Sequence, residues 1–170
     1  MRADLPALSR EFGGWVDALA AGGERPIGAR RVVGAISQPQ LDQLAARQIT
    51  PESGVLTIAD RDVLHMLRDA KVAAGEALGV DDLKRLPEIL AAPRAVLLDR
   101  ESGDLLYVFD PAAGDGRDGK LVAVLDFSTK QKSASGRRQT AVVNTIRSGG
   151  LVPRISLADQ ARYEVLEGGL

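Results

Sequence analysis

The chain has 170 residues, of which 45% are hydrophobic and 26% charged, the balance of one globular domain with a core rather than of a disordered chain. Its formal net charge is −1, so attraction to a polyanion requires local clustering of lysine and arginine. The chain contains no cysteine, which excludes disulfides and thiolate chemistry, and with a single histidine we expect neither a metal nor another cofactor.

The first 54 residues predict a helical arm. Apolar residues recur at helical spacing between Leu8 and Leu19, which predicts a helix there. Residues 24–40 mix proline and glycine with a short apolar run and are interpreted as loop and linker. A short helix follows Ser37, and turn residues at 50–54 predict a boundary between this arm and a domain spanning 55–170.

The second part changes from helical to extended periodicity. We expect a strand at 55–58, a helix from about 60 to 78 and short helical turns up to Pro93. Apolar runs bounded by turn residues then predict strands, and their short connections make neighbouring strands antiparallel. A last short helix is expected after Ser156. The predicted fold is therefore α+β, with N-terminal helices packed on a four-stranded antiparallel β-meander. The four strands are expected near 94–99, 104–109, 120–127 and 140–147.

The only histidine, His65, lies within "RDVLHMLRDAK". On a helical wheel it points away from the apolar stripe, with Arg68 on its side, whereas Lys71 lies at the border of the stripe. His65 and Lys71 are candidate catalytic groups, and Arg68 is a candidate substrate ligand. The alternatives are a solvated surface histidine and a lysine whose stem covers the edge of the core.

The segment "STKQKSASGRR" is the most basic part of the chain and contains no acid. It connects the third and fourth predicted strands, so its cations could converge on a phosphate backbone. A flexible, solvated hairpin loop is the alternative. The candidate substrate-binding residues here are Lys130, Lys132, Arg137 and Arg138.

Polar residues interrupt the last predicted strand, "VVNTIRSGG". Alternation places Thr145 and Arg147 on one face and Asn144 on the other. Arg147, beside two glycines, suits binding of a phosphate or an oxyanion. Asn144 and Thr145 are candidate catalytic residues, although a buried Asn or Thr equally suits a structural hydrogen bond.

The order of these motifs resembles the phage-associated barnase/EndoU/colicin/RelE-like nuclease domains, which are often found at the C-terminal end of Mu-like phage head morphogenesis proteins. The resemblance covers about residues 55–168 and rests on "DVLHMLRDAK", "LPEILAAPRAVLLD", "LLYVFD", "KLVAVLDF" and "VVNTIRSGG". It implies metal-independent RNA cleavage through attack of the ribose 2'-hydroxyl, with His65, Lys71, Thr145 and Asn144 at the matching positions. The chain departs from this pattern in one respect. Many such ribonucleases use two histidines, or a histidine and a glutamate, whereas this chain has a single histidine, with Lys71 six residues after it.

Three functions follow as hypotheses. The first is a ribonuclease of phage or prophage origin whose partner is RNA. The second is a non-catalytic head or virion assembly module that binds protein or nucleic acid. The third is a toxin, which would require an acidic immunity protein to cover its site. The chain lacks a long apolar run and a secretion signal, so we expect no membrane partner and a location in the bacterial cytoplasm or the virion.

Overall fold

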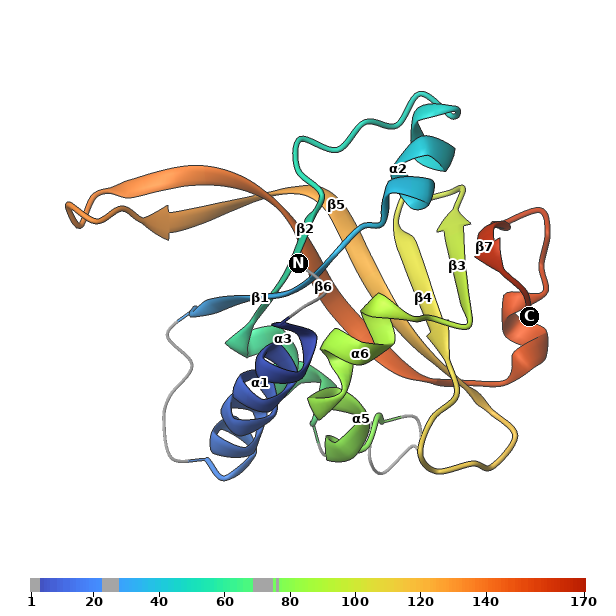
Figure 1. The fold of residues 1–170 in the computed structure, drawn as a ribbon, viewed down its shortest axis with the longest axis horizontal. Helices are drawn as coiled ribbons and strands as arrows, with labels where there is room; N and C mark the ends of the chain where they lie inside the picture. Colours follow the sequence, from blue (N-terminus) through green and yellow to red (C-terminus); the bar gives the residue numbers. More distant parts are fainter. Residues whose placement is uncertain (1–3, 23–27, 69–74, 76) are drawn as a thin grey trace.

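The computed structural model describes residues 4–22, 28–68, 75 and 77–170, and Figure 1 shows their arrangement. A mixed sheet forms the centre of the molecule, and its strands β1 to β7 occupy the order β1-β2-β6-β5-β4-β3-β7. The described elements are α1 (Leu5–Ala20), β1 (Arg30–Ala35), α2 (Gln38–Ala45), β2 (Val55–Ala59), α3 (Asp60–Met66), α5 (Val80–Lys84), α6 (Leu86–Ala91), β3 (Ala95–Asp99), β4 (Leu105–Phe109), β5 (Asp118–Lys132), β6 (Arg138–Val152), the 3₁₀ turn η2 (Arg154–Leu157) and β7 (Tyr163–Gly168).

The α+β class and the four predicted antiparallel strands are confirmed. Strands β3, β4, β5 and β6 each pair antiparallel with the next. The sheet itself is larger than a four-stranded meander, because β7 pairs antiparallel with β3, and β2 pairs parallel with β6. Strand β1 completes the sheet as the antiparallel neighbour of β2. The prediction of a four-stranded sheet is therefore wrong, because the described sheet has seven strands.

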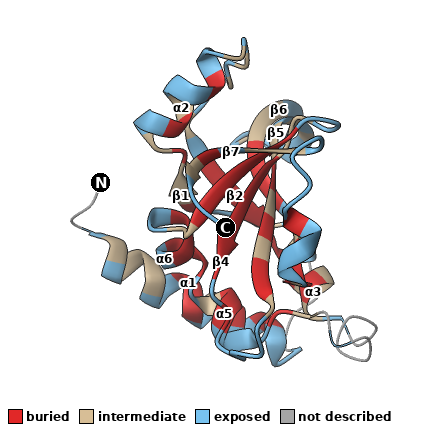
Figure 2. Cartoon of the chain, turned by 90° about the vertical axis from the view of Figure 1, so that its right-hand side faces the viewer, coloured by how far each residue is buried: buried red, intermediate tan, exposed pale blue. Residues whose placement is uncertain are grey.

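Both faces of the sheet carry apolar residues. The main core lies on the face that α1, α3, α5 and α6 cover, and it includes Val16, Ile58 and Ile146. A smaller cluster on the opposite face contains Leu97 and Leu157. Strands β3 and β4 are buried along their whole length, which explains their uninterrupted apolar sequences. In Figure 2 the buried residues gather in the central strands and in α5 and α6.

Residues of the predicted arm contribute to this same core. Phe12 and Val16 of α1 and Leu44 of α2 pack with residues of the later strands. Helix α2 begins as its sequence predicts, because Ser37 and Gln40 form a reciprocal capping box. The proposed division at residue 54 stays a prediction about domain organisation.

Two segments adopt a structure other than the predicted one because distant partners stabilise them as strands. Residues 30–35, predicted as part of a linker, form β1 by pairing with β2. The expected C-terminal helix is replaced by the short turn η2 and by β7, which adds to the exposed edge of β3. In both segments the pairing strand decides the conformation against a weak local preference.

The predicted helix 60–78 is also too long. Helix α3 ends at Met66, and residues 67–68, 75 and 77–78 are not helical. A Cβ added at Gly149 would lie 2.9 Å from both Met66 Sδ and Leu78 Cδ1, so these two side chains meet at one place. In a continuous helix, twelve residues would separate them by about 18 Å. A single helix from 60 to 78 is therefore excluded.

The predicted basic loop 128–138 is mostly strand. Strand β5 continues to Lys132 and β6 starts at Arg138, and their last paired residues are Lys132 and Arg138. Only residues 133–137 form the turn, closed by a hydrogen bond from the amide of Ser133 to the carbonyl of Arg137. Gly136 supplies the positive φ of 78° that this turn requires. The two strand ends form a ribbon that projects from the sheet in Figure 1, here called the β5–β6 arm and defined as residues 128–140.

Candidate functional site

Arg30 lies at the centre of a hydrogen-bonded group on the face of the sheet opposite the main core. Thr57 of β2 and Thr145 of β6 are direct partners in the parallel pairing, so their side chains lie next to each other. Arg30 NH1 donates to Thr145 Oγ1 at 2.6 Å and to Thr57 Oγ1 at 3.2 Å. The Thr57 hydroxyl donates in turn to the carbonyl of Asn144 at 2.9 Å. Three strands thus fix one guanidinium group.

The electrostatic environment of Arg30 is unfavourable to its charge. Burial lowers the pKa of Arg30 below its ordinary value, and the nearby charge of Arg147 acts in the same direction. The carboxylates of Asp62 and Asp60 oppose this change but do not offset it. No carboxylate of the described residues forms an ion pair with Arg30. Arg30 is therefore a half-buried cation that has no direct counter-ion in the part of the chain that the structure describes.

Arg147 and Asp62 lie beside this group. Arg147 Nε is 3.4 Å from Asp62 Oδ1, and the guanidinium carbon of Arg147 lies 4.5 Å from the centre of the Phe127 ring. Burial raises the pKa of Asp62, although the positive charges of Arg147, Arg30 and His65 act to lower it. The side chain of Asp62 is only 15% exposed. Asp62 thus forms its ion pair with Arg147, and it also acts electrostatically on Arg30.

A cleft of about 970 Å³ lies between β1 and the β5–β6 arm. Among the described residues, its lining contains threonine and glutamine side chains but no aspartate or glutamate. In a chain whose formal net charge is −1, such a lining concentrates positive charge in one place. The cationic residues that line the cleft are Arg30, Arg31, Arg61, Lys130, Lys132 and Arg138.

The structure brings some of the predicted site residues to this cleft. Lys130, Lys132 and Arg138 line it, and Thr145 binds Arg30 beneath it. Arg147 lies next to that group, within electrostatic reach of Arg30. Arg137 is exposed in the turn of the arm and is not part of the lining.

Two residues of the predicted helix 60–78, His65 and Arg68, are not part of the lining. His65 is half-buried on α3, one turn after Arg61, which does line the cleft. His65 is close enough to Asp62 to affect its pKa. Arg68 is exposed just beyond the end of α3. Lys71 lies outside the described residues.

Asn144 faces away from Arg30, on the other side of β6. Its Nδ2 donates to the carbonyls of Ser53 at 2.6 Å and Val55 at 3.3 Å, and its Oδ1 accepts from the amide of Asp126 at 3.0 Å. Asp126 has a positive φ of 50°, where the β5–β6 register shifts. The Asn144 amide thus holds a bulge of β5 and the start of β2 in place.

Sequence reasoning missed the residues contributed by β1 and β2. Arg30 and Arg31 lie in the segment interpreted as linker, and Thr57 lies in a strand read only for its apolar residues. The available signal was the pair of arginines directly before "VV", since an apolar run next to adjacent cations is compatible with an edge strand facing solvent.

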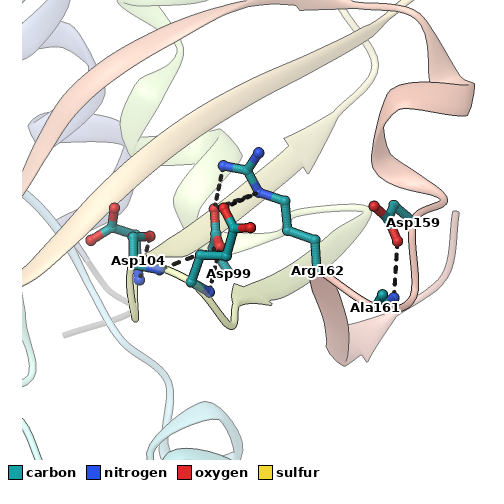
Figure 3. Close-up of polar contacts among 7 residues, drawn as sticks. Asp99, Asp104, Asp159, Ala161 and Arg162 are labelled. Carbon is teal, nitrogen blue, oxygen red and sulfur yellow. Dashed lines mark hydrogen bonds and ion pairs between the residues drawn. The ribbon is translucent and has the colours of Figure 1, made fainter.

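A second polar cluster lies at the opposite end of the sheet (Figure 3). Asp99 Oδ2 accepts from Arg162 Nε at 3.2 Å and NH2 at 3.0 Å, and Asp99 Oδ1 accepts from the amides of Glu101 and Ser102. Asp159 accepts from the amide of Ala161 in the same region. Every one of these carboxylates has partners within the chain, so this cluster fixes the β3–β4 turn and the approach to β7.

Two features were not found in the described part of the chain. Among those residues, no group of three or more His, Cys, Asp or Glu side chains is placed to hold a metal ion. No described helix is long and apolar enough to cross a membrane.

Comparison with known proteins gives one partial similarity. The chain is 33% identical over 95 residues to "Putative capsid assembly protein F" of Escherichia phage Mu. The matched region covers 56% of this chain and 20% of that protein, so the chain corresponds to a small part of its relative. No protein-family model matches the chain, and no solved structure matches it.

Proposed function

We propose that this chain is a nucleic-acid-binding module that takes part in phage head assembly and holds a phosphodiester backbone in the cleft between β1 and the β5–β6 arm. The observation that carries the proposal is the lining of the cleft, which gathers arginine and lysine and includes no carboxylate from the part of the chain that the structure describes. Cations placed in this way release counter-ions from a nucleic acid and bind it without regard to sequence. The similarity to a Mu capsid assembly protein supports the head-assembly context.

The test measures how binding depends on salt. Fluorescence anisotropy with a labelled single-stranded 12-mer should show an affinity that falls with salt, with a slope of about −0.7 per phosphate contact. Replacing Lys130, Lys132 and Arg138 by alanine should weaken binding and flatten the slope by about 2. A matched variant removes three cations outside the cleft, Arg10, Lys84 and Arg100, with the same change of net charge.

The two triple variants separate local from overall charge. Equal loss of affinity in both would mean that only net charge matters, and the cleft would not be the binding site. A cleft variant whose affinity depends on salt as steeply as that of the wild type would also refute the proposal. Arg137→Ala should weaken binding less than an alanine substitution of any cation in the lining, because Arg137 lies at the tip of the arm.

Metal-independent RNA cleavage is a second candidate function, and one observation favours it. Burial raises the pKa of Asp62 above its ordinary value, and His65 and two arginines lie within electrostatic reach of it, a combination typical of acid–base sites. A protein that acts in this way should cut RNA in the presence of a chelator and leave 2',3'-cyclic phosphate ends. His65→Ala, Lys71→Ala and Asp62→Asn should each slow cleavage about a hundredfold or more. Intact RNA after prolonged incubation would leave binding as the function.

A further inference from the structure

We infer that Arg30 is a phosphate-binding residue in the floor of the cleft, where its guanidinium edge takes two oxygens of one backbone phosphodiester. This inference rests on the proposed function and assigns a specific anion subsite to it. Arg30 belongs to β1, whereas the sequence-predicted cations that line the cleft belong to the β5–β6 arm. The subsite would therefore add an anion-binding group at the floor of the cleft, outside the arm.

The hydrogen bonds of Arg30 leave one edge of its guanidinium group available. Arg30 NH1 uses its two hydrogens on Thr57 and Thr145. A guanidinium group carries five N–H donors, so the Nε and NH2 edge retains three. Neither nitrogen has a partner among the described residues, and neither is sealed from solvent. That edge has the parallel fork geometry that binds a phosphate through two hydrogen bonds.

The group is also held in position before any ligand binds. The Thr57 hydroxyl donates its hydrogen to the carbonyl of Asn144, so its lone pairs are available to accept a hydrogen bond from Arg30. Thr145 is completely buried and Thr57 is 9% exposed, so packing fixes both acceptors. A side chain that is already ordered loses little entropy on binding, which favours affinity.

The local charges favour an anion at this position. Asp62 and Asp60 partly offset the charge of Arg30, but Asp62 forms its ion pair with Arg147 at 3.4 Å, and Arg147 repels Arg30. Arg61 adds a further positive charge to the wall of the cleft. A phosphate at Arg30 would relieve the repulsion between the two arginines and supply the direct counter-ion that the described residues do not provide.

Single substitutions test this subsite by anisotropy with a labelled 12-residue oligouridylate. Arg30→Gln should weaken binding about 10- to 100-fold and reduce the salt slope by about 0.7, the loss of one phosphate contact. Arg30→Lys keeps the positive charge but removes the two parallel N–H donors of the guanidinium group. This variant should therefore show the same salt dependence as the wild type but bind more weakly. Arg10→Gln, an exposed cation on α1, is the control of equal charge change and should bind as the wild type does.

Two further variants test the positioning. Thr145→Val removes the acceptor at 2.6 Å and should weaken binding several-fold without changing the salt slope, because the cation remains. Thr145→Ser retains a hydroxyl and should restore most of the affinity. Circular dichroism and thermal unfolding establish that each variant is folded, and Arg30→Lys serves as the reporter if Arg30→Gln does not fold.

The outcomes distinguish the subsite from the proposed function. Salt-dependent binding by the wild type, with Arg30→Gln equal to Arg10→Gln, would overturn the subsite and leave the cleft intact. Wild-type protein that binds no oligouridylate in a salt-dependent way would overturn the proposed function itself. Arg30→Gln should weaken oligothymidylate binding by the same factor, since both polymers present the same phosphate. An effect confined to the RNA would show that Arg30 contacts the ribose, and would refute phosphate recognition.

Discussion

Replacing Asn144 by alanine should destabilise the fold without weakening phosphate binding by the folded protein. The Asn144 side chain is 1% exposed and makes three hydrogen bonds to backbone groups of two other segments. A typical intramolecular hydrogen bond contributes about 1 kcal/mol, and a buried group left without a partner costs about 1–3 kcal/mol. Ser53, Val55 and Asp126 are exposed residues, so water would replace part of what the amide supplies. We therefore expect a loss of about 2–3 kcal/mol.

Urea unfolding at neutral pH measures this loss. With a slope of about 2 kcal/mol per molar urea, the midpoint should fall by about 1–1.5 M. Gln139→Ala is the matched control, because Gln139 lies exposed on the same strand and should change stability by less than about 0.5 kcal/mol. Under conditions where the variant is folded, oligouridylate should bind with wild-type affinity.

Two results would refute this reasoning. An unchanged midpoint for Asn144→Ala would mean that its hydrogen bonds contribute nothing net to folding. A stable variant that no longer binds or cleaves RNA would mean that the amide acts on the ligand, as the sequence alone allowed. The structure supports a structural role for Asn144, because the oxygen and the nitrogen of its side-chain amide already form hydrogen bonds with the backbone.

Two further predictions concern packing and pH. Gly119→Ala should destabilise the protein by about 1–3 kcal/mol in the same urea assay, because a methyl group at position 119 would overlap the ring of Phe109; equal stability would show that the ring moves aside freely. Burial acts to raise the pKa of Asp99, but hydrogen bonds from Arg162 and two backbone amides outweigh it and lower the pKa below its ordinary value. The stabilisation by Asp99 is therefore complete above about pH 4 and lost as the pH falls through the folded-state pKa, so the difference in stability between wild type and Asp99→Asn should shrink on acidification. A difference that stayed constant with pH would contradict this account.

The elements that could be predicted from sequence are those with strong local signals. Ser37 and Gln40 mark the start of α2 through side-chain capping, which depends only on neighbouring residues. Strands β3 and β4 are apolar along their length because both of their faces are covered. The change to extended periodicity near residue 94 therefore located the antiparallel part of the sheet.

The elements that were missed depend on partners far away in the sequence. Strand β1 is held by β2, and β7 by β3, and neither has a clear apolar pattern of its own. The β5–β6 arm was taken for a loop because both of its faces meet solvent, so its strands carry polar residues throughout. Arg30 escaped notice for the same reason: its partner Thr145 lies 115 positions away.

The parallel pairing of β2 with β6 has a consequence for how the molecule folds. The hydrogen bond between the Thr57 hydroxyl and the Asn144 carbonyl joins residues 87 positions apart, whereas β3, β4, β5 and β6 are joined in succession by short connections. Contacts between distant residues carry the larger loop-closure entropy and form more slowly. During synthesis on a ribosome, β2 could not pair with β6 until most of the chain had been made. We therefore expect the two walls of the cleft to meet late in folding, and a chain truncated before β6 to lack an assembled binding site.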